Sequence, residues 1–178
     1  MLRLFVGLDL PSPQRELLAA LAGGLPGARW VPPENYHLTL RFIGATAHHV
    51  AEEIDHALAG LRQRSFEMTL GGLGSFAKGG RATQLWVGVA RCEPLERLAG
   101  KIDTALARLG LPTERRRFVP HISIARLDNV AESAVGGFIA RHNLFVAPPM
   151  MVDHFVLFSS RLGKERSVYT AEVAYELS

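Results

Sequence analysis

A histidine, an aliphatic residue, a hydroxyl residue and a second aliphatic residue occur in this order twice in the 178-residue chain. The copies are His37-Leu38-Thr39-Leu40 and His121-Ile122-Ser123-Ile124, 84 positions apart (121 − 37). Alternate side chains of a β-strand share a face, so each copy predicts a strand with an imidazole beside a hydroxyl on one face and two aliphatic side chains on the other. Two such strands in so small a chain indicate a repeated unit.

The segments around the two copies also follow a common order of apolar strand, amphipathic helix, motif strand, amphipathic helix and further strand. We infer an internal duplication of a β-α-β-α-β unit. The expected fold is α+β: one domain over residues 1–178, made of two pseudo-symmetric lobes, with antiparallel-rich sheets lining a central cleft and helices outside. Helical apolar stripes are expected near residues 12–22, 46–61, 95–109 and 130–139, and a glycine-rich segment at 71–80 separates the units.

Composition fits an intracellular protein of one domain. A chain of this length with 48% hydrophobic residues can bury one core. The single cysteine, Cys92, excludes an internal disulfide and suits a reducing cytoplasm. The apolar residues 2–10 are too short to span a membrane and Asp9 interrupts them, so we expect neither a signal peptide nor a membrane partner. The net charge of +3 is compatible with a phosphate-bearing partner.

The paired motifs suit acid–base chemistry on a phosphodiester. Imidazole titrates near neutral pH, so one ring can be neutral while the other is protonated. Hydrolysis needs both states, a base for the attacking water and an acid for the departing oxygen. The hydroxyls of Thr39 and Ser123 can donate hydrogen bonds to non-bridging phosphoryl oxygens, where charge gathers in the transition state. The residues themselves do not distinguish the acid from the base.

These motifs resemble the 2H phosphoesterase superfamily, defined by two H-x-[ST]-x tetrads, and within it the RNA 2′,3′-cyclic phosphodiesterase (2′-5′ RNA ligase-like) family. The similarity is carried by RLFVGLDLP at residues 3–11, HLTLRFIG at 37–44 and VPHISIAR at 119–126. Either tetrad alone is a weak pattern, whereas two in tandem with the opening strand form a strong one. The departure from the family pattern is Ser123, where threonine is the commoner residue.

The resemblance implies hydrolysis of RNA 2′,3′-cyclic phosphate ends to 2′-phosphates, without a metal or other cofactor. It assigns His37 as the proton donor and His121 as the proton acceptor, with Thr39 and Ser123 as further catalytic residues. It also implies RNA as the partner, and the reverse joining of RNA ends through a 2′-5′ linkage as a secondary activity. We expect a monomer.

Two arginines are candidate substrate-binding residues. Arg41 shares the predicted face of His37 and could bind phosphate. Arg126 has the opposite parity from His121, so it reaches the cleft only if the strand bends or ends there, although the resemblance favours substrate binding. The run Arg115-Arg116-Arg117 could guide an RNA backbone, but a solvated surface is the simpler interpretation.

Two alternative functions are compatible with the motifs. One is a 2H phosphoesterase acting on a small cyclic nucleotide or an ADP-ribose-derived cyclic phosphate. The other is a catalytically silent RNA-binding module, against which the completeness of both tetrads argues. A histidine- and glutamate-rich helix at residues 48–56 lacks a recognised metal-ligand spacing and indicates an exposed polar face.

Overall fold

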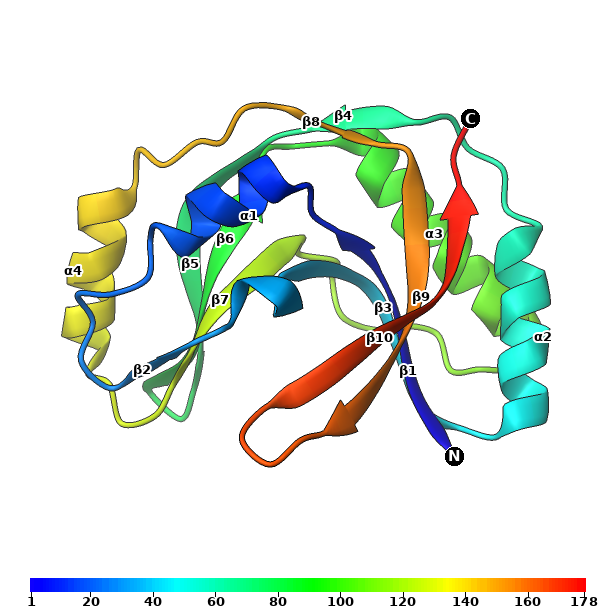
Figure 1. Cartoon of the computed structure of the whole chain (residues 1–178), viewed down its shortest axis with the longest axis horizontal. Coiled ribbons are helices and arrows are strands. Elements are labelled where there is room, and N and C mark those ends of the chain that lie inside the picture. Colours follow the sequence, from blue (N-terminus) through cyan, green and yellow to red (C-terminus); the bar gives the residue numbers. More distant parts are fainter.

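The computed structural model describes all 178 residues and has the expected α+β composition (Figure 1). Each motif histidine is the first residue of its strand. In chain order the elements are β1 (Leu2–Asp9), α1 (Ser12–Ala19), β2 (Ala28–Trp30), the 3-10 helix η1 (Pro33–Asn35), β3 (His37–Thr46), α2 (His48–Ala59), β4 (Phe66–Met68), β5 (Leu70–Lys78), β6 (Arg81–Val89), α3 (Glu93–Arg108), β7 (His121–Leu127), α4 (Glu132–His142), β8 (Met150–Val152), β9 (His154–Leu162) and β10 (Ser167–Glu176).

The two motif strands are neighbours at the centre of one antiparallel sheet of order β10-β9-β1-β3-β7-β6-β5. A single register pair, Leu38 opposite Ile122, joins β3 to β7. Beyond that pair, β7 continues with β2 and β6 as its neighbours instead of β3. The motif strands therefore begin side by side and then separate.

The predicted duplication is present, but the two units are interleaved. The first unit runs from β1 to β5 and the second from β6 to β9. Their last strands are exchanged, because β5 pairs with β6 of the second unit and β9 pairs with β1 of the first. The short strands β4 and β8, one from each unit, pair with each other. Each side of the sheet is thus built from both halves of the chain.

The helices cover the sheet on its outer side (Figure 1). Helix α3 packs against β3, α2 against α3 and β10, and α4 against β5 and β6. Leu95, Leu98, Ile102 and Leu106 of α3 form a helical apolar stripe that is fully buried. None of these helices is both long and apolar enough to cross a membrane.

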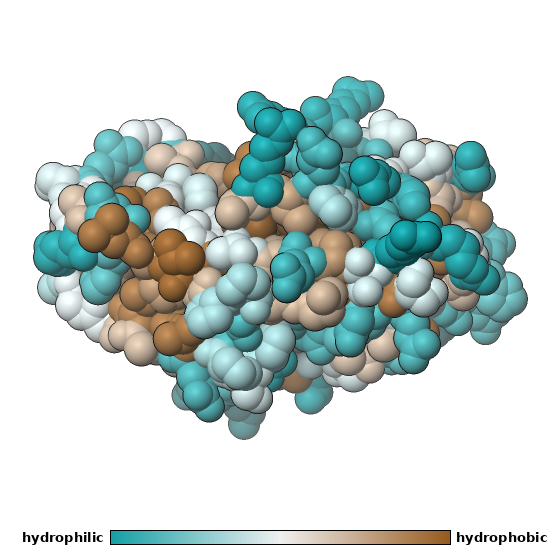
Figure 2. All heavy atoms as spheres, turned by 90° about the horizontal axis from the view of Figure 1, so that it is seen from above, coloured by the Kyte–Doolittle hydropathy of each residue, from teal (hydrophilic) through white to brown (hydrophobic).

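The surface seen from above Figure 1 is hydrophilic over much of its area, with apolar side chains gathered at one end (Figure 2). The segment that joins α4 to β8 contributes two exposed apolar residues, Leu144 and Val146. Their exposure leaves the continuous core unaffected, because that core is formed by the sheet and the buried helix stripes.

The glycine-rich segment forms an edge strand and a hairpin turn. Most of it belongs to β5, and Gly79 and Gly80 have φ values of 60° and 76°, as a tight two-residue hairpin turn requires. A Cβ atom on Gly74 would lie 2.4 Å from the ring of Trp86 on β6. The absence of a side chain there makes room for that indole.

His154, at the start of β9, links that strand to the end of β1. Its Nε2 lies 2.7 Å from Asp9 Oδ1 and its Nδ1 lies 2.6 Å from Asp153 Oδ1. Partial burial acts to lower the pKa of His154, but the hydrogen bonds and charges of the two carboxylates outweigh it and raise the pKa above the ordinary value. The imidazolium form is therefore stabilised by folding.

We expect the variant His154→Gln to be less stable than the wild type below pH 6.5, by roughly 2 °C in Tm because the group is partly exposed. A raised folded-state pKa gives stability that is fully present below the unfolded-state pKa and is lost as the pH rises through the folded-state pKa. Thermal melts of both proteins between pH 5.5 and 9 should converge at the alkaline end. A difference in Tm that is constant with pH would contradict this interpretation.

Candidate active site

The histidine and hydroxyl residues of both tetrads line one cavity. His37 and Thr39 reach it from β3, and His121 and Ser123 reach it from β7. Its volume is about 340 Å³, and Arg126 lies in the same wall. The aliphatic residues between them, Leu38 and Ile122, are fully buried on the other face, as the alternation predicts.

Both imidazoles are held by the same backbone contact. His37 Nδ1 lies 2.8 Å from the carbonyl oxygen of Asn35, and His121 Nδ1 lies 2.7 Å from that of Val119, each two residues earlier in the chain. A carbonyl only accepts hydrogen bonds, so Nδ1 carries the proton in both rings. Nε2 is therefore the atom that remains available to take or give a proton.

Aromatic rings fix the two imidazoles from the side. The ring of His37 lies 4.8 Å from Phe5 and 5.0 Å from Tyr169, between ring centroids. The ring of His121 lies 4.9 Å from Phe76 and 5.9 Å from Trp86. Phe5 and Trp86 stand on the opening strands of the two units, so the aromatic support is duplicated along with the tetrads.

The two imidazoles influence each other electrostatically. Burial lowers the pKa of His37 below the ordinary histidine value, the hydrogen bond to the Asn35 carbonyl partly offsets this, and the charge of His121 lowers it further. Placing positive charge on both rings together is therefore unfavourable. A pair with one neutral and one charged imidazole is the arrangement that acid–base catalysis needs.

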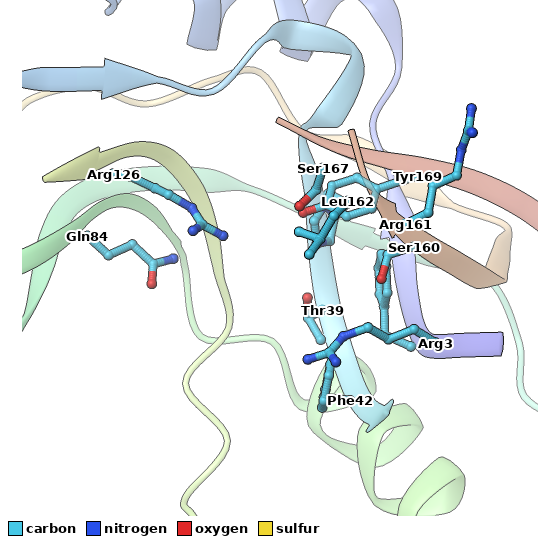
Figure 3. Close-up of a pocket in the computed structure, with 12 residues that line it drawn as sticks. Arg3, Thr39, Phe42, Gln84, Arg126, Ser160, Arg161, Leu162, Ser167 and Tyr169 are labelled. Atoms are coloured by element: carbon cyan, nitrogen blue, oxygen red, sulfur yellow. The ribbon is translucent and has the colours of Figure 1, made fainter. Parts of the chain in front are cut away.

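A β-bulge in each motif strand decides which arginine faces the cavity. Opposite β6, residue Ile124 is inserted in β7, since Ser123 pairs with Trp86 and Ala125 with Leu85. The insertion reverses the alternation, so Arg126, paired with Gln84, shares the face of Ser123. Figure 3 shows Arg126 extending from this wall toward Thr39 and Tyr169 on the other side.

The expected placement of Arg41 on the face of His37 is wrong. An equivalent bulge at Leu40 places Arg41 opposite the buried Val6 and turns its side chain toward α3. There its Nε donates to Asp103 Oδ1 at 2.9 Å, and its side chain is 11% exposed. Its guanidinium also donates to the carbonyl oxygen of Pro112, so the hydrogen bonds of this side chain are made within the protein. Phe42 takes the position on the cavity face instead.

Several residues of the site lie outside the tetrads and were not predicted from them. A larger cavity of about 590 Å³ adjoins the first, and its walls include Arg3, Phe42 and Arg161 (Figure 3). The guanidinium of Arg3 lies over the ring of Phe42, 5.4 Å from its centroid. Arg3 is two residues before Phe5 in a strand, so period-2 alternation from Phe5 was the available indication of its position.

The remaining basic and acidic clusters lie apart from the cavities. Arg115, Arg116 and Arg117 are exposed and line neither cavity. Arg81, beyond the glycine-rich segment, donates to Asn129 Oδ1 at 2.8 Å. No three histidine, cysteine, aspartate or glutamate side chains converge in a way that could hold a metal ion.

Two interleaved α+β units that bring two histidine–hydroxyl strands to one cavity define a 2H phosphoesterase. The chain belongs to the LigT-like phosphoesterase family: the family model described as "LigT like Phosphoesterase" matches residues 8–86 and again 87–169. Each match begins near the end of a unit's opening strand, β1 or β6, and contains that unit's histidine tetrad.

Relatives named RNA 2′,3′-cyclic phosphodiesterase occur in archaea and bacteria. The Archaeoglobus fulgidus protein is 30% identical over 171 residues, covering 94% of this chain and 96% of its own. The Aeropyrum pernix protein is 38% identical over 105 residues, and the match covers 58% of this chain and 59% of the relative. The Geobacillus stearothermophilus protein is 32% identical over 128 residues, covering 68% of this chain and 41% of the relative. The chain thus spans less than two thirds of the last two proteins.

Solved structures agree with this assignment. Escherichia coli LigT complexed with 3′-AMP has a TM-score of 0.82 and 26% identity, over 99% of this chain and 98% of that chain. A protein of Thermus thermophilus, with 23% identity and a TM-score of 0.82 over 98% and 97% of the two chains, shares the fold.

Proposed function

We propose that the protein hydrolyses the 2′,3′-cyclic phosphate at the 3′ end of an RNA to a 2′-phosphomonoester, with His37 and His121 as general acid and base. The observation that carries the proposal is the pair of imidazoles, each with its Nδ1 bound to a backbone carbonyl and its Nε2 available, in the walls of one cavity. The names of the relatives agree in substrate class.

In the proposed reaction the phosphorus atom lies between the two Nε2 atoms. His121 takes a proton from a water molecule as its oxygen bonds to phosphorus, the bond from phosphorus to the 3′ oxygen breaks, and His37 gives its proton to that oxygen. Thr39, Ser123 and Arg126 donate hydrogen bonds to the non-bridging oxygens. The negative phosphate raises the lowered pKa of His37 when it binds, and so favours its protonated form.

Three further assignments belong to the same proposal. The joining of RNA ends through a 2′-5′ linkage, which is the reverse of 2′-5′ cleavage, is a secondary activity in which a 5′ hydroxyl replaces the attacking water, His121 takes its proton and His37 protonates the departing 3′ oxygen. Residues 1–178 act as one domain of two lobes and as a monomer, because a single chain supplies both halves of the cavity. The lone thiol of Cys92 fits a reducing compartment such as the cytoplasm.

The test is the product formed from a short RNA ending in a 2′,3′-cyclic phosphate, incubated with the protein in the presence of EDTA. We expect complete conversion to the 2′-phosphate, identified by mass and by linkage-specific digestion, since both proton transfers use imidazoles. Adenosine 2′,3′-cyclic phosphate and an ADP-ribose-derived cyclic phosphate serve as competing substrates. Formation of the 3′-phosphate, or activity that requires a divalent ion, would contradict the mechanism.

We expect kcat/KM for this reaction to have a bell-shaped dependence on pH, because it reports the free-enzyme pKa values of both imidazoles. Below the lower pKa both rings are protonated and no base is present; above the higher one both are neutral and no acid is present. Since the pKa of His37 lies below 6.5, the acidic limb, in which kcat/KM decreases with decreasing pH, should be centred at a pH below 6.5. Initial rates between pH 4 and 9 measure it, and a flat profile would exclude the paired acid and base.

A further inference from the structure

A second groove continues from the catalytic cavity between β2 and the turn that joins β9 to β10, residues 163–166. Its volume is about 390 Å³, comparable to that of the cavity around the histidines. The two share Val31, Asn35, Arg126 and Tyr169 in their walls. The Nδ2 of Asn35 donates to the carbonyl oxygen of Ser167 at 3.0 Å, which ties the groove's floor to β10.

The groove contains two neighbouring positive charges that a bound anion would stabilise. Arg29 of β2 stands directly opposite Arg126 of β7 in the antiparallel register, so both side chains are on one face of the sheet. Like charges directly opposite each other destabilise a strand pair. Arg126 has no carboxylate partner, and that of Arg29 is Asp128, in an ion pair exposed on both sides. A phosphate between the two arginines would remove the repulsion.

The opposite wall of the groove is basic as well. The β9–β10 turn contributes Lys164 and Arg166 together with Glu165, and Lys164 has no ion-pair partner. Arg166 is 3.8 Å from Glu34 in a pair exposed on both sides, and exposed pairs of this kind are weak. Leu162, at the start of the turn, is 91% exposed and lies in the walls of this groove and of the cavity that contains Arg3. The groove therefore offers cations for a backbone phosphate and an apolar contact for a base.

We propose that this groove binds the phosphodiester and nucleoside immediately 5′ of the terminal nucleotide, which makes the protein select oligonucleotides over mononucleotides. The inference rests on the proposed function, since it takes the terminal cyclic phosphate to lie between the two histidines. Arg29 and Lys164 bind the internal phosphate from the two sides of the groove. Arg126 lines both the groove and the catalytic cavity, so it lies between the internal phosphate and the terminal one.

The test compares a dinucleotide ending in a 2′,3′-cyclic phosphate, ApA-cyclic phosphate, with adenosine 2′,3′-cyclic phosphate. We expect a higher kcat/KM for the dinucleotide, and a fall of about tenfold in the ratio of the two values in the double variant Arg29→Gln/Lys164→Gln. The matched control is Arg97→Gln/Arg108→Gln, which removes the same charge from exposed positions on α3 and should keep the wild-type ratio.

Equal kcat/KM values in the wild type, or an unchanged ratio in the groove variant, would overturn the subsite and leave the proposed function standing. If neither substrate is hydrolysed, the proposed function fails, and the subsite is decided by calorimetric titration of the two 2′-phosphate products. Tighter binding of the dinucleotide product that is lost in the groove variant supports the subsite, and equal binding of both products rejects it. Thermal melts establish that each variant is folded.

Discussion

Replacing His37 or His121 with glutamine should lower kcat for cyclic-phosphate hydrolysis by roughly 10²–10⁴-fold, because each variant loses one proton transfer. A substrate in which sulfur replaces the bridging 3′ oxygen distinguishes the two roles. A thiolate leaves without a proton near neutral pH, since the thiol pKa is about 8.5, whereas an alkoxide requires one. We therefore expect the sulfur substrate to restore much of the rate of His37→Gln and little of that of His121→Gln. Single-turnover rates on both substrates measure the effect.

The control for these variants is His49→Gln, on the exposed face of α2, which should keep the wild-type rate on both substrates. Restoration of His121→Gln instead of His37→Gln would exchange the acid and base assignments. The lowered pKa of His37 gives this comparison its importance, because it favours a neutral ring in the free protein. Wild-type rates in both variants would exclude a catalytic role for the two histidines.

The sequence was sufficient to predict that both tetrads lie on strands, that the order of elements is duplicated, and which face of each motif strand is buried. The alternation of His37 and Thr39 against Leu38 is a local property of an extended chain, and the buried partners follow from it. The exchange of β5 and β9 between the units was not predictable in this way. It depends on which strands pair across long separations, and the apolar patterns of β5 and β9 are compatible with either partner.

The bulges explain why Arg41 was misplaced and why Arg126 reaches the cavity despite its parity. Period-2 alternation assumes an unbroken strand, and the inserted residues Leu40 and Ile124 each reverse it. Both lie three positions after the motif histidine, so aligning the two copies pairs Arg41 with Ala125 and Phe42 with Arg126. Ala125 is fully buried, and this comparison was the available signal that the position after the bulge faces away from the cavity.

These opposite placements predict opposite consequences for two arginine-to-alanine variants. Arg126→Ala should lower kcat/KM by roughly tenfold to a hundredfold, since it removes charge-assisted hydrogen bonds to the phosphate, and should leave Tm close to that of the wild type. Arg41→Ala should lower the free energy of unfolding by about 1–3 kcal/mol, because it leaves Asp103 without its ion-pair partner, and should retain most activity in the folded fraction. Urea unfolding and initial-rate kinetics on both variants measure the two effects. A catalytic loss in Arg41→Ala at full stability would place its guanidinium at the substrate, and would mean that the bulge at Leu40 does not persist when RNA binds.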